Sequence, residues 1–353
     1  HTLQLYAAVL TPLKHLEGIV WRFREIIEES QVAHLSALSS IRSLYYLDYM
    51  YGPHIKAFIN YLIEPNINEK KFKNMAQAQD YIFTVVKDEV ETSLNTILKI
   101  QEEAPTNWEF AFDAYVLSGY DAESGKKFLS DSKRYQRKVT KAHLNFVTSA
   151  MHRFLGGVKY MVNYNLNDIS EFSNELVRAT SLNNLLRTKP VPMTPKESRK
   201  IIGHKDYKNF LTLRTDNETA LVNIQESLVH FSEATKYDLA AITSVYETSD
   251  LAMADTYMLD PHFVHVNYTE NVQTLNEKIE LYQEALAGKE SLITSEITGK
   301  QIKVNISSLF KPYQDLKSFL PTKKGFYGDK TGKKLKKNGK TLRHNKSRNC
   351  LLY

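Results

Sequence analysis

Apolar residues recur every three or four positions through most of this chain, which is the spacing that places side chains on one face of an α-helix. The apolar stripes run over residues 5–27, 35–47, 55–62, 82–98, 135–161 and 272–286. Further helices are expected near residues 196–213 and 218–257. Only 13 Gly and 10 Pro interrupt the 353 residues, so long helices are expected. The pattern therefore predicts a mainly α fold with a multi-helix, bundle-like body.

Helix-end signals agree with these stripes. In a capping box, a Ser, Thr or Asp side chain accepts from an early helical N–H, and a Glu three residues later reaches back to the first residue. This spacing occurs in the pairs Thr106 and Glu109, Asp168 and Glu171, Thr194 and Glu197, and Thr215 and Glu218. Gly288 is expected to cap the end of the last helix. Gly156 and Gly157 are interpreted as a close approach of two helices.

Three closely spaced Pro divide the chain at residues 188–195, because each disfavours helix at the residue before it. We therefore expect an N-terminal helical domain (residues 1–187). The C-terminal helical segment (residues 196–288) forms a second unit or packs into the same body.

The pattern changes after Gly288 from a helical period to alternation around Gly299 and Lys300. This predicts a β-hairpin near residues 291–306. A two-stranded hairpin is marginally stable alone, so residues 289–320 are expected to lie against the helices through apolar residues such as Phe310 and Leu316.

The positive charge of the chain is concentrated at its end. Residues 321–353 contain nine Lys and two Arg against one acid, Asp329, and so carry +10. Because the whole chain carries +6, the preceding 320 residues carry −4. A basic tail of this kind binds a polyanion, such as nucleic acid or an anionic membrane surface, or only keeps the protein soluble. The candidate polyanion-binding residues are Lys333, Lys334, Lys336, Lys337, Lys340 and Arg343.

A metal site is the main enzymatic hypothesis. Asp260, His262 and His265 lie within six residues, and carboxylate and imidazole groups bind zinc or copper. Pro261 indicates that a helix or a loop begins between them. No further ligand is identifiable in the sequence, and a solvent-facing loop is the competing interpretation.

Other catalytic signatures are absent from the sequence. His143 and His152 stand nine residues apart and His230 stands alone, so these histidines are expected to be ordinary surface or interhelix residues. There is no nucleophile elbow, Walker loop or dinucleotide-binding glycine motif, so no cofactor is predicted. Cys350 is the single cysteine, which excludes an intramolecular disulfide. No segment has the ~20 consecutive apolar residues of a membrane span.

These observations favour a non-enzymatic helical binding or scaffold protein with a protein partner. The start at His1, without an initiator Met, fits a trimmed bacterial exported or lipid-anchored protein. The compartment stays open, with a periplasmic or cell-envelope location favoured over the cytoplasm. The alternatives are a metal-dependent enzyme with its site near residues 260–265 and polyanion binding through residues 321–353.

Overall fold

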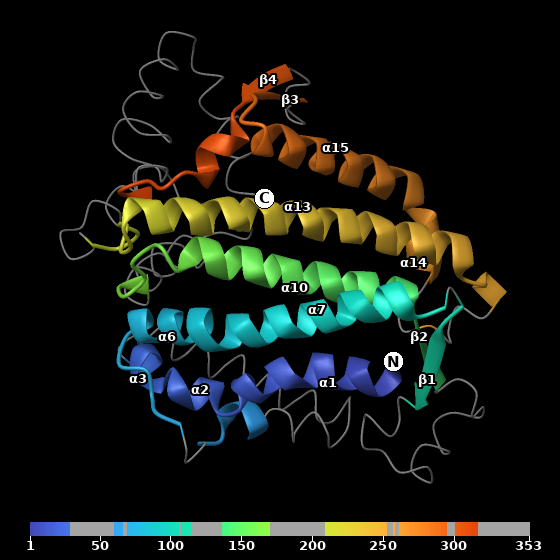
Figure 1. Cartoon of the computed structure of the whole chain (residues 1–353), viewed down its shortest axis with the longest axis horizontal. Coiled ribbons are helices and arrows are strands. Elements are labelled where there is room, and N and C mark those ends of the chain that lie inside the picture. Colours follow the sequence, from blue (N-terminus) through green and yellow to red (C-terminus); the bar gives the residue numbers. More distant parts are fainter. Residues whose placement is uncertain are drawn as a thin grey trace, which may run out of the picture.

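The computed structural model confirms the mainly α class (Figure 1). It describes residues 1–28, 60–65, 69–105, 107–113, 136–169, 209–252, 257, 261–294 and 301–316. Helices make up 73% of the described residues. Within these ranges, no helix has the length and the apolar composition that crossing a membrane requires. The Pro-rich connection (188–195) and the basic tail (321–353) lie outside these ranges, so both remain predictions.

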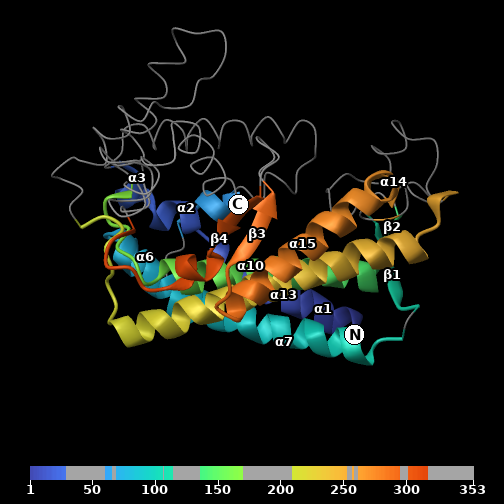
Figure 2. The ribbon, with the colours of Figure 1, turned by 90° about the horizontal axis from the view of Figure 1, so that it is seen from above.

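Five long helices lie side by side in one row, in the order of the sequence (Figure 1). They are α1 (Thr2–Leu13), α7 (Lys87–Glu103), α10 (Lys141–Met161), α13 (Asn217–Thr248) and α15 (Tyr268–Leu286). Each packs on the next helix of the row. Seen from above, α15 crosses α13 obliquely (Figure 2). The body is thus a layer of helices in which α10 is central, with α7 on one side and α13 on the other.

The N-terminal apolar stripe forms several short elements instead of the single helix predicted over residues 5–27. After α1 come η1 (Lys14–Leu16), α2 (Ile19–Arg22) and α3 (Arg24–Glu28). The break is at Gly18, which has a φ of 59°. A glycine adopts this left-handed conformation without steric cost, but a continuous right-handed helix cannot include it.

The apolar core between α1, α7 and α10 follows the predicted stripe over residues 82–98. Helix α6 (Met75–Tyr81) leads through one π-helical turn, η2 (Ile82–Val86), into α7. Ile97 and Ile100 of α7 are almost completely buried. They belong to a cluster made of Leu5, Ala8, Ile97, Ile100, Ala104 and Leu144. Burial of this apolar surface stabilises the α7 side of the layer by roughly 25 cal/mol per Å².

A two-stranded antiparallel sheet that the sequence did not predict joins β1 (Glu109–Asp113) to β2 (Gln136–Thr140). Phe110 stands opposite Val139 in this register. The capping-box prediction at Thr106 and Glu109 is wrong, because Glu109 begins a strand. The helix predicted from residue 135 is likewise too long, because residues 136–140 pair with β1 before α10 begins.

The buried face of α10 also differs from the predicted one. The apolar stripe includes Ala150 and Phe154, yet both are exposed, and Phe154 has an exposed fraction of 38%. Ser149 and Gly156 are buried instead. Polar and small residues therefore form the side of the central helix that faces α13, as the contacts of the functional site show.

Helix α13 begins one residue away from the predicted cap. Asp216, rather than Thr215, accepts from the backbone N–H of Thr219 at 2.8 Å. The helix ends at Thr248 rather than near residue 257. Within the predicted helix over 196–213, the described residues 209–213 form a turn and isolated bridges instead of a helix. The two capping boxes at residues 168–171 and 194–197 include residues outside the described ranges.

The end of α15 confirms the prediction for Gly288. This glycine has a φ of 68°, and its backbone N–H donates to the carbonyl of Ala285 at 3.0 Å. The N–H of Lys289 reaches back to the carbonyl of Glu284 at 2.8 Å. These two bonds are those of a Schellman motif, which satisfies the last carbonyls of the helix.

The predicted hairpin is also confirmed. Strand β3 (Ser291–Thr294) pairs with the antiparallel β4 (Gln301–Val304). The chain then forms η6 (Ile306–Phe310). Phe310 and Leu316 pack against Tyr164, Ala220 and Ile224 at the start of α13, as expected of a docking segment.

Candidate functional site

Polar side chains meet along the middle of the interface between α10 and α13, which we call the polar seam. On α10 the participating residues are spaced by three or four positions, so they share one face. They are Ser149, His152, Gly156 and Lys159, followed by Asn163 just beyond the end of α10, and all five are buried. Their partners on α13 are Asn223, Glu226, Ser227, His230 and the carbonyl of Ala234. Helices α10 and α13 run antiparallel, so residues that are far apart in the sequence lie opposite one another.

Two histidines meet in the middle of the polar seam. The Nδ1 atoms of His152 and His230 are 2.9 Å apart, which is a direct hydrogen bond. One Nδ1–H therefore donates to the other, unprotonated Nδ1. The ring of Tyr237 stacks on His152 with a centroid distance of 5.5 Å.

Burial of these rings disfavours their charged forms. The pKa of His230 is lowered to about 4, first by burial and then by the neighbouring His152 and Lys159. The pKa of His152 is also lowered by burial, and Glu233 opposes part of this effect. Both rings are consequently neutral near pH 7.

Ion pairs flank the histidines on both sides. Arg153 donates to Asp238, whose side chain is largely buried. The ammonium group of Lys159 lies 2.7 Å from a carboxylate oxygen of Glu226 and 3.1 Å from one of Glu91. Because Glu91 belongs to α7, Lys159 links three helices of the layer. Buried charges of this kind need such partners, since an isolated one costs several kcal/mol.

Close backbone approach completes the polar seam. The hydroxyl of Ser227 donates to the carbonyl of Gly156 at 2.7 Å. A Cβ added at Gly156 would lie 3.2 Å from the ring of Phe231 and 3.2 Å from the carbonyl oxygen of Ser227, which confirms the predicted close approach there. Gly157 has no such neighbour within 4 Å, so the same prediction is wrong for that residue.

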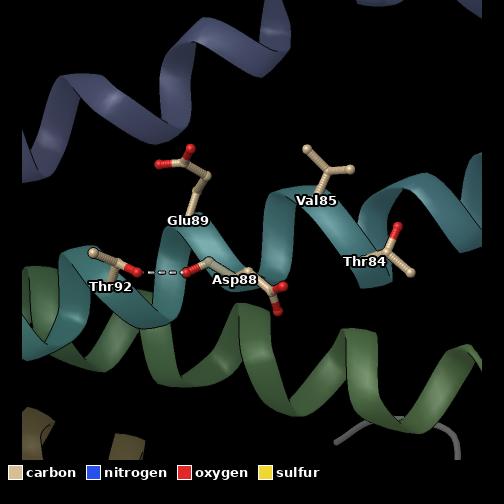
Figure 3. A pocket seen from close by; sticks show the side chains of 5 residues that line it. All are labelled: Thr84, Val85, Asp88, Glu89 and Thr92. Carbon is tan, nitrogen blue, oxygen red and sulfur yellow. Dashed lines mark hydrogen bonds between the residues drawn. The ribbon is translucent and has the colours of Figure 1, made fainter.

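A shallow hollow lies over the π-helical turn η2 and the first turns of α7 (Figure 3). It is an open groove of about 420 Å³ lined by Thr84, Val85, Asp88, Glu89 and Thr92. Glu89 pairs with Lys14 at 2.6 Å, and the hydroxyl of Thr92 donates to the carbonyl of Asp88 at 2.9 Å. Asp88 is mostly exposed. The volume lies in the range of ligand sites, and π-helical turns occur often at functional sites.

Two of the predicted metal residues, His262 and His265, lie in α14 (Pro261–Val266), at one end of the layer. His262 is exposed, whereas Nε2 of His265 is buried and its ring lies 4.5 Å from that of Tyr246. Asp260 falls outside the described residues. Over the described ranges, no three His, Cys, Asp or Glu side chains are close enough to hold a metal ion together. The hypothesis of a site completed by Asp260 stays a prediction, as does the basic tail.

Two histidines that sequence analysis did not connect, His152 and His230, form the central contact of the polar seam. The interhelix interpretation is correct for both His152 and His230, but their pairing with each other was not predicted. His143 accepts from the backbone N–H of Thr140 at 3.0 Å and closes a capping box at the start of α10. The available signal was the period of three and four in Ser149, His152 and Gly156, which resembles a solvated helix face until its partner helix is known.

Comparisons with protein-family models, curated proteins and solved structures give no match to this chain. Its function is therefore inferred from its own geometry.

Proposed function

We propose that this chain is a non-enzymatic helical binding or scaffold protein, which holds a protein partner on one face of its helical layer. The observation that carries the proposal is the polar seam. Its ionisable groups converge, as catalytic groups do, but they bind one another. His152 is bonded to His230, and Lys159 is bonded to Glu226 and Glu91. Side chains paired in this way fix the helices in register, and a scaffold protein needs such a fixed framework to hold a partner.

The binding face follows from helical geometry. Lys159 reaches Glu91 of α7 and Glu226 of α13, so these three residues mark one side of the layer. Asp88 lies three positions before Glu91, so the two are neighbours on the surface of α7. The groove that Asp88 lines is therefore on or beside this side. Val222 and Val229 lie four positions before and three after Glu226, and their exposed fractions are 54% and 46%. We call this side the groove face.

The groove face combines the features of a protein-binding surface. Exposed aliphatic side chains on α13 offer apolar area to a partner, while the carboxylates of the groove provide polar contacts at its edge. The face spans three helices that are held together by packing and by the polar seam. Such a rigid platform keeps the entropy cost of binding low.

Site-specific photocrosslinking tests this proposal. A benzophenone amino acid at Val229 is expected to capture one discrete protein in extracts of the source cells. The same probe at Leu10, an exposed residue on α1 at the edge of the row, serves as the control and is expected to capture none. Adding Val222→Asp to the Val229 probe is expected to abolish the adduct. Identical products at both positions, or an adduct that survives Val222→Asp, would contradict binding at the groove face.

A further inference from the structure

The His152–His230 pair differs from the other links of the polar seam because both of its members are imidazoles, which gain a positive charge on acidification. In the neutral pair each ring carries one proton, and only one of these lies between the two Nδ1 atoms, which are 2.9 Å apart. A first added proton is accommodated at an outer Nε2 and leaves this hydrogen bond intact. A second proton places an N–H on both facing nitrogens, so the bond is lost and two positive charges face each other.

The charged and polar groups around the pair determine how unfavourable this second protonation is. From α13, Glu226 and Glu233 face the pair and favour protonation, and Glu91 does so from α7. Lys159 of α10 opposes it. Tyr237 stacks on His152 and stays neutral because burial raises its pKa. Burial of both rings outweighs the nearby carboxylates, since it is the largest influence on each.

Apolar clusters stand at both ends of the seam. At one end Ala142 of α10 packs with Ile242 and Val245 of α13. At the other end Tyr164, just beyond α10, packs with Ala220 and Ile224. Apolar contacts do not titrate, so these ends hold when the pH falls. In the middle of the interface the described links are mostly hydrogen bonds, with the ring of Phe231 lying against Gly156.

We propose that the His152–His230 pair is a proton-operated latch, which holds the middle of α10 against α13 when both rings are neutral and releases it when both are charged. Release widens the interface between its two apolar ends, lets water reach the rings and moves α13 away from α7. The groove face spans these same helices, so acidification changes its shape. The latch itself does not depend on the proposed binding function.

The size of the effect follows from proton linkage. The open form exposes His230, so its pKa returns toward the ordinary value of 6.5, whereas in the closed form it is about 4. At about pH 4.5, this difference raises the ratio of open to closed forms on the order of 100-fold for this histidine alone. Well above 6.5 neither form binds the proton, and the ratio becomes independent of pH.

The test is a spin-label distance between α7 and α13. Cysteines replace the exposed Asn95 and Gln225 after the single native cysteine is removed by Cys350→Ser. Distances are compared at about pH 7.5 and about pH 4.5, on either side of most histidine titration. We expect one narrow distribution at the higher pH and a longer, broader one at the lower pH.

Two variants separate the latch from general acid effects, because carboxylates begin to protonate in the same range. His230→Gln keeps a hydrogen-bonding side chain without an added charge and is expected to hold the narrow distribution at both pH values. His143→Gln is the matched control, since burial also lowers the pKa of His143 but this residue caps the start of α10. It is expected to respond to acid like the parent protein.

Two results would overturn the latch. One is an unchanged distance distribution in the parent protein at the lower pH. The other is a His230→Gln protein that opens as far as the parent does. Circular dichroism at the higher pH establishes that the variant is folded, and His152→Gln takes its place if it is not.

Discussion

The two sides of α10 are built on opposite principles. Toward α7 the contacts are mainly apolar, with Leu155 of α10 packed against Val90 and Leu94. Toward α13 they are polar along the middle of the interface, with the His152–His230 bond at the centre. Apolar contacts contribute most of the stability but tolerate sliding, whereas hydrogen-bonded pairs contribute less and fix the register. The difference indicates that the α7 side stabilises the fold and that the polar seam sets the position of α13.

The largest predicted effect is on the apolar side. Ile97 is completely buried, so Ile97→Ala removes packed methyl groups and leaves a cavity. We expect the free energy of unfolding to fall by about 3 kcal/mol, measured by urea denaturation. Val222→Ala on the exposed side of α13 is the control, with a change within about 0.5 kcal/mol. An Ile97→Ala protein as stable as the control would refute the assignment of the core.

A single link of the polar seam is expected to contribute less. Ser227→Ala leaves the buried carbonyl of Gly156 without its hydroxyl donor. The predicted loss in the free energy of unfolding is about 1–2 kcal/mol. Thr248→Ala removes an exposed hydroxyl that donates to the carbonyl of Ser244, and its loss is expected to be smaller. Equal losses in the two variants would mean that the Ser227 hydrogen bond is as accessible to water as the surface bond of Thr248.

The pH dependence of stability is a property of the polar seam. Burial lowers the pKa of His230 from 6.5 to about 4, so the unfolded chain binds more protons between these values. The free energy of unfolding therefore stays level above 6.5 and falls as the pH drops toward 4. Urea denaturation across this range is expected to give a shallower acid slope for His230→Gln than for the parent, by up to about 1.4 kcal/mol per pH unit. Identical slopes would mean that His230 titrates normally in the folded protein.

The smallest predicted effect separates two adjacent glycines. Gly157→Ala meets no neighbour, so it gains helix propensity and is expected to stabilise the protein by about 0.5–1 kcal/mol. Gly156→Ala places its methyl group against Phe231 and the backbone of Ser227, so the gain is cancelled or reversed. Thermal unfolding of both variants measures the difference. A Gly156→Ala protein as stable as Gly157→Ala would mean that the helices are farther apart.

Local signals predicted much of the fold. The stripe over residues 82–98 marks the buried side of α7, because apolar residues repeated at each helical turn are stabilised by packing against other apolar surface. Gly288 ends α15 because the left-handed conformation there suits glycine. The β3–β4 hairpin was predictable because its two strands are close in sequence.

Features that depend on distant residues were not predictable in this way. Strands β1 and β2 pair across an intervening segment of more than 20 residues, and the alternation in each strand is short. The polar seam is harder still. A stripe such as Ser149, His152 and Gly156 is typical of a solvated face, and only the antiparallel docking of α13 turns it into an interior. Neither the register of that docking nor the meeting of His152 with His230 is encoded in local periodicity.

The central claim, that α10 and α13 are held in register by direct polar pairs, is tested most directly by a double-mutant cycle on the histidine pair. The free energies of unfolding of His152→Ala, His230→Ala and the double variant are compared with that of the parent protein at neutral pH. We predict a coupling energy of about 1 kcal/mol, which vanishes when both rings are protonated. Strictly additive effects at neutral pH would contradict the claim, because they would mean that the two rings do not stabilise one another.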